Sequence, residues 1–377
     1  MDAAKTGPEL NEAIKNLKQN LFSNFQGAAT KTAEEDMVDS QKTIDNQTEL
    51  PDISSSDREY FKNNMTGYFN TAKQNISDVG FDDEGNIDTI KEYIQNDKNS
   101  NAAEIVLAKE LGATKKSTKA TLEAAAEKDK KDISELPFFG QDNIAQYTGQ
   151  IDQTINDTFN TMDDVHTVEG VVALKEAANA QMSATMAVAK AFSDKKVAKD
   201  AEIQAQKMAK EAEIDAKKFN ATVTTNFKAE VQNAYDNFKT NLTDAKDEAG
   251  VAAATDTFDG AINKIDQEIK AFEEAIQNAK KAVNDAVAAG KTTIDALRNV
   301  TDKEYFNGEI TKAQTAGMDA IDAATTTDDV AKAGAEAKAA IQKIAADAQA
   351  LDKQIPETLS TIQKNVQAKK DEIKGLS

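Results

Sequence analysis

Apolar residues recur every three or four positions along most of this chain, the spacing that places side chains on one face of an α-helix. Helix-breaking residues are scarce, with 4 prolines and 16 glycines among 377 residues. The pattern therefore predicts an all-α fold of long amphipathic helices. Its clearest apolar runs are Ile14, Leu17, Leu21, Phe22 and Phe25 near the N-terminus and Ile262, Ile265, Ile269, Phe272 and Ile276 after Phe258.

Two similar phrases, SDREYF at 56–61 and TDKEYF at 301–306, predict where two helices begin. Each fits the capping box, in which a Ser or Thr side chain caps the helix and a Glu three residues later bonds back to the backbone of the capping residue. A third segment, SELPFF at 134–139, aligns with them but lacks the glutamate. The predicted caps are Ser56 with Glu59, Ser134, and Thr301 with Glu304.

The aromatic residue that closes each phrase recurs through the chain. Phe61, Phe139, Phe219 and Phe306 are separated by 78, 80 and 87 residues, which predicts a helical repeat of roughly eighty residues with these rings as core anchors. A second shared phrase, TMDDV and later TTDDV, predicts a tight turn between two antiparallel helices of roughly 25 residues. The predicted domains are an N-terminal helical segment over 1–55 and four repeats over 56–133, 134–213, 214–300 and 301–377.

The uninterrupted stretches predict how the repeats are joined. No proline or glycine occurs from Ser193 to Asn241, which indicates one long helix or two continuous ones linking neighbouring repeats. Gly290 is expected to end or loosen its helix, and Pro356 suits the first turn of a terminal helix. We therefore expect an elongated array of antiparallel helical hairpins or three-helix bundles that share long helices.

Composition argues against several functional classes. A formal charge of −20 disfavours a broad basic surface for nucleic acid. The absence of cysteine excludes disulfides and thiolate metal sites. The N-terminal residues lack the basic and apolar regions of a secretory signal, and no run of 18 apolar residues occurs, so the sequence predicts no membrane span.

Candidate chemistry is sparse. His166, the single histidine, follows two aspartates, but no second histidine or cysteine completes a metal site or a catalytic triad. The acidic phrase at 82–88 has the composition of a calcium loop, yet aligning Gly85 with the loop glycine puts Gly80 at the first ligand position. Neither a phosphate loop nor a dinucleotide fingerprint is present. The sequence thus predicts no catalytic, cofactor-binding or metal-ligating residue and no enzyme activity.

The segment AGMDAIDAATTTDDV at 316–330, followed by Ala333 and the stretch from Ala337 to Ile341, resembles the repeat of very long cell-wall-anchored surface proteins of Gram-positive bacteria. The resemblance is good over 300–345 and partial over 130–180. It implies a helical repeat of roughly eighty residues arrayed in tandem, as in the stalks of matrix-binding and biofilm-associated adhesins.

Three functions are compatible with these patterns. The first is a non-enzymatic extracellular helical-repeat protein that serves as a spacer or adhesive surface on a Gram-positive cell, with a host matrix or serum protein, or a second copy of itself, as partner. The second is a soluble helical pore-forming toxin or membrane-active component, whose inserting helix would be the apolar stretch from Val168 to Phe192, although that stretch also suits a helix core. The third is an array of three-helix modules that binds host albumin or immunoglobulin. No cofactor and no nucleic-acid partner is expected, and the expected location is extracellular or at the cell surface.

Overall fold

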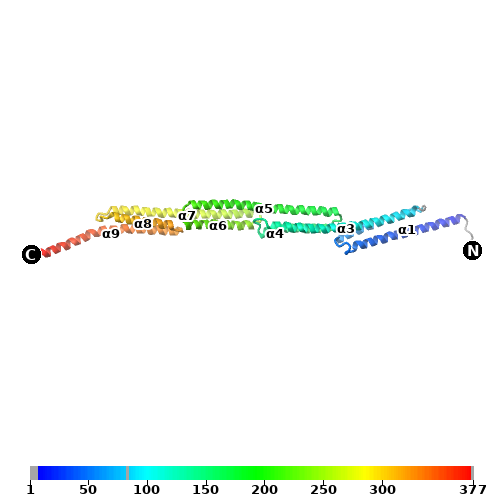
Figure 1. Cartoon of the computed structure of the whole chain (residues 1–377), viewed down its shortest axis with the longest axis horizontal. Coiled ribbons are helices and arrows are strands. Elements are labelled where there is room, and N and C mark those ends of the chain that lie inside the picture. The colour runs from blue at the N-terminus through cyan, green and yellow to red at the C-terminus, as the bar shows by residue number, and fades with distance from the viewer. Residues whose placement is uncertain (1–6, 82–84, 375–377) are drawn as a thin grey trace. The chain divides into compact units, whose positions relative to one another are not determined.

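The computed structural model describes residues 7–81 and 85–374, which form helices joined by turns and contain no β-strand (Figure 1). This confirms the all-α prediction. Residues 82–84, which carry the acidic part of the calcium-like phrase, lie outside the described residues.

Short and long helices alternate along the described chain after α1. The short helices contain 21–24 residues and the long ones 48–50. The predicted length of roughly 25 residues therefore fits only the first helix of each hairpin. The helices are α1 Gly7–Asp45, α2 Ser55–Asp78, α3 Gly85–Ser134, α4 Gln141–Asp163, α5 Val168–Ala216, α6 Ala221–Asp244, α7 Glu248–Asp295, α8 Lys303–Ala323 and α9 Thr327–Lys374.

The chain forms two compact units, Met1–Asp194 and Lys195–Ser377, and α5 contributes residues to both. In the first unit, α1, α2 and the first part of α3 pack as a three-helix bundle. The second part of α3 lies alongside α4, where Lys130 pairs with Asp152 at 3.0 Å. A long helix therefore serves two successive bundles, which accounts for its being about twice the length of a short one.

The second unit repeats this use of a long helix. The first part of α7 packs with α5 and α6, as in the cluster of Ile269 with Ile214 and Val231. Its second part packs with α8 and α9, where Val287 and Ile341 share a core. This last core is the largest apolar cluster of the second unit among the described residues, and it extends from Val223 to Ala348.

The predicted continuity of one segment needs correction. The segment 193–241 is not continuous, because α5 ends at Ala216 and α6 begins at Ala221. Lys218 in the turn has a left-handed φ of 57°, and Phe138, at the matching place before α4, has a φ of 56°. The contacts of α6 with α5, such as that of Tyr235 with Asp200 at 2.9 Å, stabilise a turn for which neither glycine nor proline is needed.

The expected roles of Gly290 and Pro356 are also wrong. Helix α7 passes Gly290 without a break, and a Cβ atom there would lie 3.0 Å from Ile310 and 3.3 Å from Ile341, so the glycine allows close packing. Pro356 lies inside α9, which continues past it to Lys374, so it does not begin a separate terminal helix. The apolar residues beyond it are exposed, namely Leu359, Ile362, Val366 and Ile373.

Candidate functional site

The most connected polar cluster of the first unit begins at the N-terminus of α2. Ser54 caps this helix, and its Oγ accepts a hydrogen bond from the backbone N–H of Asp57 at 3.0 Å. The carboxylate of Asp57 in turn accepts from the backbone N–H of Ser54 at 2.8 Å. This is a capping box with aspartate as its acid, and it holds Asp57 in a fully buried position.

Lys115, from the middle of α3, supplies the opposite charge. Its Nζ lies 2.9 Å from Oδ1 and 2.7 Å from Oδ2 of Asp57, and the lysine is only 2% exposed. Removing two charges from water costs several kcal/mol for each ion, so a buried pair persists only where further hydrogen bonds satisfy both partners. The pair therefore depends on its neighbours.

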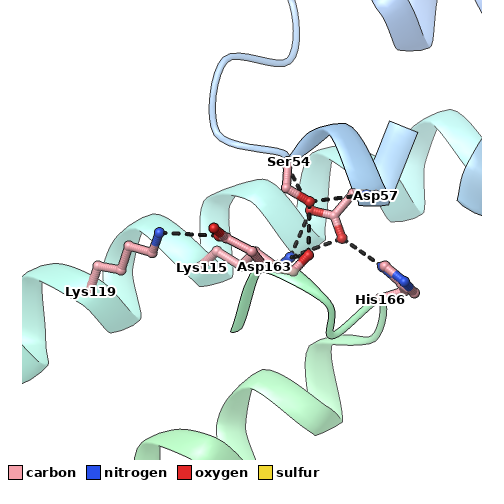
Figure 2. A network of polar contacts seen from close by, with 6 residues as sticks. All are labelled: Ser54, Asp57, Lys115, Lys119, Asp163 and His166. Carbon is pink, nitrogen blue, oxygen red and sulfur yellow. Dashed lines mark hydrogen bonds and ion pairs between the residues drawn. The ribbon is translucent and has the colours of Figure 1, made fainter. Parts of the chain in front are cut away.

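The turn between α4 and α5 provides those neighbours. His166 places Nδ1 2.9 Å from Oδ1 of Asp57 and stacks on the ring of Tyr60, with the centroids 4.7 Å apart. The main-chain oxygen of Asp163, at the end of α4, accepts from Ser54 Oγ at 2.8 Å and from Lys115 Nζ at 3.4 Å. Figure 2 shows Ser54, Lys115 and His166 around the carboxylate of Asp57. Lys119 of α3 lies to one side, with its Nζ 3.5 Å from Oδ1 of Asp163. We call this network the polar joint: Ser54, Asp57, Lys115, Lys119, Asp163 and His166.

The polar joint keeps Asp57 ionised. Burial alone would raise the pKa of its carboxyl group, but the hydrogen bonds from Lys115, His166 and the backbone of Ser54 outweigh burial and hold the pKa below its ordinary value. The network consequently ties the start of α2 to the middle of α3 and to the end of α4 through a single charged carboxylate.

This depressed pKa predicts a loss of stability in acid. A carboxylate whose pKa is lower in the folded state stabilises the fold above its unfolded pKa of about 3.9 and loses that contribution as the pH falls through the folded value. We expect the difference in unfolding free energy between the wild type and Asp57→Asn to be full at pH 6 and to shrink below about pH 4. Urea denaturation followed by circular dichroism at several pH values measures it. A difference that is as large at pH 2 as at pH 6 would contradict this assignment, and Asp39→Asn, an exposed site on α1, is the control.

In the second unit, too, polar side chains donate hydrogen bonds to main-chain oxygens at the ends of helices. Asn220 caps α6 and donates from Nδ2 to the main-chain oxygens of Asp322 at 3.1 Å and Ala324 at 2.8 Å, at the end of α8. The buried Lys196 donates to the main-chain oxygens of Thr243 at 3.2 Å and Ala245 at 2.6 Å, at the end of α6. In each case a polar side chain satisfies carbonyl groups that a helix C-terminus leaves open.

The residues that make these contacts at the helix ends differ between the first and the second unit. Lys115 and Lys196 are 81 residues apart, as are Asp163 and Asp244. Burial lowers the pKa of Lys196 to about 8, while Asp244 acts in the opposite direction. Three residues after the cap, where α2 has Asp57, α6 has the buried Val223. The contact at the helix ends therefore recurs, whereas the buried ion pair is a feature of the first unit among the described residues.

The predicted helix caps lie close to the observed ones but do not coincide with them. The cap of α2 is Ser54 with Asp57 instead of Ser56 with Glu59, because the earlier pair also bonds to α3 and α4. The cap of α8 is Asp302, whose side chain accepts from the N–H of Tyr305, so Thr301 and Glu304 do not form the box. Ser134 ends α3, its hydroxyl donating to Lys131 O at 2.6 Å, and Gly140 takes the cap position of α4.

The four predicted anchor rings differ in burial. Phe61 and Phe139 are 2% and 8% exposed. Phe219 and Phe306 are half-buried and pack against the core that α7, α8 and α9 share. Phe61 belongs to α2 and Phe306 to α8, whereas Phe139 and Phe219 lie in the turns before α4 and α6. The ring thus marks the start of each short helix without holding one fixed position in it.

The arrangement of the polar joint suits a structural role. Among the described residues no group of three or more His, Cys, Asp or Glu side chains is placed to hold a metal ion. The carboxylate of Asp57 and the amine of Lys115 are both nearly inaccessible to solvent and bonded to one another. None of the described helices is long and apolar enough to cross a membrane.

Comparison with known proteins adds one finding. Residues 276–349 match the model of a family described as Domain of Unknown Function (DUF1542), a domain found in Gram-positive surface proteins. No curated protein and no solved structure matches the chain. The matched residues cover the second part of α7, all of α8 and the first part of α9, which together form one three-helix bundle.

That bundle is packed unusually closely at two glycines. A Cβ atom at Gly317 of α8 would lie 2.3 Å from the Cβ of Ala337 on α9, and one at Gly334 would lie 2.8 Å from the Cβ of Ala279 on α7. Only glycine permits such approaches, because real Cβ atoms do not come this near. The phrase that resembles the surface-protein repeat, which contains Gly317, therefore encodes a helix contact.

Proposed function

We propose that this chain is a non-enzymatic helical-repeat protein of a Gram-positive cell surface, which acts as a spacer and as an interaction surface. The observation that carries the proposal is the recurring contact between the cap of one short helix and the terminal carbonyls of the next, seen at Ser54 and again at Asn220. Such contacts, together with helices shared by two bundles, join repeats without flexible linkers. The match to a domain found in Gram-positive surface proteins supports the location.

The absence of enzyme activity is part of the proposal. It is supported by the contacts of the polar joint, because the side chains of Lys115 and His166 both bond to the carboxylate of Asp57. Groups that satisfy one another in this way stabilise a fold and are poorly placed to act on a substrate.

A partner would bind along helix faces. Apolar side chains are exposed on the first turns of α1 and on the last turns of α9, a distribution that suits contact with another protein. We propose a host matrix or serum protein, or a second copy of the chain, as the partner. The residues concerned are Leu10, Ile14, Leu17 and Leu21 on α1 and Leu359, Ile362, Val366 and Ile373 on α9.

The spacer function predicts an extended particle in solution. A compact globule of this length has a radius of gyration of about 21 Å. We expect small-angle scattering on a sample shown to be monomeric by light scattering to give a clearly larger value. A radius near that of a globule would contradict the spacer function.

The interaction surface is tested by capture of serum or matrix protein on the immobilised chain. Loss of the captured protein in Ile362→Asp, but not in the control Thr361→Asp, would support this surface.

A further inference from the structure

A second buried polar cluster lies between α1 and α3 and is chemically unlike the polar joint. Asp97 and Asn101, one turn apart on α3, are 3% and 0% exposed, and the half-buried Asp36 faces them from α1. The amide Nδ2 of Asn101 lies 3.2 Å from Oδ2 of Asp36 and 3.4 Å from Oδ2 of Asp97. Two carboxylates thus converge on one side-chain amide inside the bundle.

Nothing in the described part of the chain neutralises this cluster. Neither Asp36 nor Asp97 takes part in an ion pair, and Glu104, one turn further along α3, bonds only to the neutral side chains of Asn64 and Tyr68 at 3.4 and 2.8 Å. A buried carboxylate without a counter-charge is costly, so the site favours a positive species.

Two oxygen atoms of the cluster have no partner. Oδ1 of Asp97 and Oδ1 of Asn101 are buried and accept no hydrogen bond. Buried polar atoms are nearly always satisfied, so such atoms beside two carboxylates suit a ligand that accepts electron pairs from oxygen. Turning the amide of Asn101 about its Cβ–Cγ bond would bring its oxygen to the present place of Nδ2, between the two carboxylates.

The spacing of these atoms suits a hard cation. Oxygen ligands at 2.3–2.6 Å from Ca²⁺ lie roughly 2.8–3.7 Å from each other when they are adjacent in its coordination sphere. The contacts of 3.2 and 3.4 Å between the amide and the two carboxylates fall in that range. Ca²⁺ fits better than Mg²⁺, because it accepts bidentate carboxylates and irregular geometry, with water completing the shell.

We propose that the α1–α3 interface binds one Ca²⁺ ion through Asp36, Asp97 and Asn101. The third ligand is a side-chain amide, which explains why no set of three His, Cys, Asp or Glu residues marks the site. The ion joins α1 to α3 and replaces repulsion between two aspartates with shared coordination. Sequence patterns predict no metal here, since Asp36 and Asp97 are 61 residues apart.

Hydrogen exchange on the full chain tests the site. Amides in peptides covering 29–45 and 90–111 are compared in 10 mM CaCl₂ and in EDTA, both in 0.15 M NaCl to screen the acidic surface. An ion bound with a Kd of about 10⁻⁴–10⁻³ M slows local opening about 10- to 100-fold under these conditions. We expect this protection in the wild type and in Asp39→Asn, an exposed residue of α1, and expect none in Asp97→Asn or Asp36→Asn.

The outcomes distinguish a specific Ca²⁺ site from a general effect of the acidic surface and from the binding of a proton. Equal exchange with and without Ca²⁺ in the wild type overturns the proposal, as does protection that Asp97→Asn retains, since that protection would come from the general acidic surface. Protection that increases as the pH falls from 7.5 to 5, and that is the same with and without Ca²⁺, would mean that the cluster binds a proton. This result would also overturn the proposal. Circular dichroism shows whether each variant is folded, and the isosteric Asp36→Asn, at the half-buried position, provides a second test should Asp97→Asn not fold.

Discussion

Replacing Asp57 by alanine is expected to destabilise the first unit by about 3–5 kcal/mol, because it leaves the amine of Lys115 buried without its counter-ion. The same change removes the acid of the capping box and the partner of His166, so α2, α3 and the end of α4 should all open more readily. Hydrogen exchange measures this locally as a fall in the free energy of opening for peptides from these three helices. Peptides from α8 and α9 in the second unit serve as an internal reference.

A double-mutant cycle isolates the ion pair. Lys115→Met alone leaves a buried carboxylate and should also cost several kcal/mol, whereas Lys115→Met in the Asp57→Ala background should cost much less than it does in the wild type. Asp39→Asn breaks an exposed pair with Lys42 and should cost at most about 1 kcal/mol. Additive effects of the two substitutions would show that Asp57 and Lys115 do not stabilise the fold as a pair.

The all-α fold could be predicted because its signal is local and repeated. Spacings such as Ile265, Ile269 and Phe272 put apolar groups on one helix face, and few prolines or glycines compete with helix formation. The ends of the helices were predicted less accurately. In the stretch of three serines before Asp57 more than one capping box is possible, and contacts with Lys115 and Asp163, distant in sequence, select Ser54.

The polar joint could not be predicted from local patterns. His166 and Asp57 are 109 residues apart, and Lys115 lies in a helix where lysine is common. One signal was available: Lys115 and Lys196 share the 81-residue spacing that also relates Asp163 to Asp244, so a comparison in repeat register would have singled out a recurring lysine. It would not have shown that either lysine is buried, because burial depends on the turn that covers it.

Polar contacts between helix ends have a specific use in a protein of this composition. Alanine-rich helix faces are similar along their length, so apolar packing alone discriminates weakly between registers of one helix against another. Ser54 and Asn220 bond to particular carbonyl groups, and a shift by one turn would break those hydrogen bonds. We infer that these two caps fix the register between the helices that they join.

Gly317→Ala should destabilise the bundle of α7, α8 and α9 by about 1–3 kcal/mol, although alanine favours helices more than glycine does. The added methyl would lie 2.3 Å from the Cβ of Ala337, on a neighbouring helix that cannot yield without moving its backbone. Thermal unfolding and hydrogen exchange of peptides from α8 and α9 measure the loss.

Two further substitutions test whether the contact between α8 and α9 causes the loss of stability. Gly308→Ala, on the same helix with open space around it, should be neutral or stabilising by up to about 1 kcal/mol. Adding Ala337→Gly to Gly317→Ala should restore most of the lost stability, because it removes the methyl that the new side chain would meet. A Gly317→Ala variant as stable as Gly308→Ala would mean that α8 and α9 are not held this close. The glycine in the phrase that resembles the surface-protein repeat would then need an explanation other than close packing.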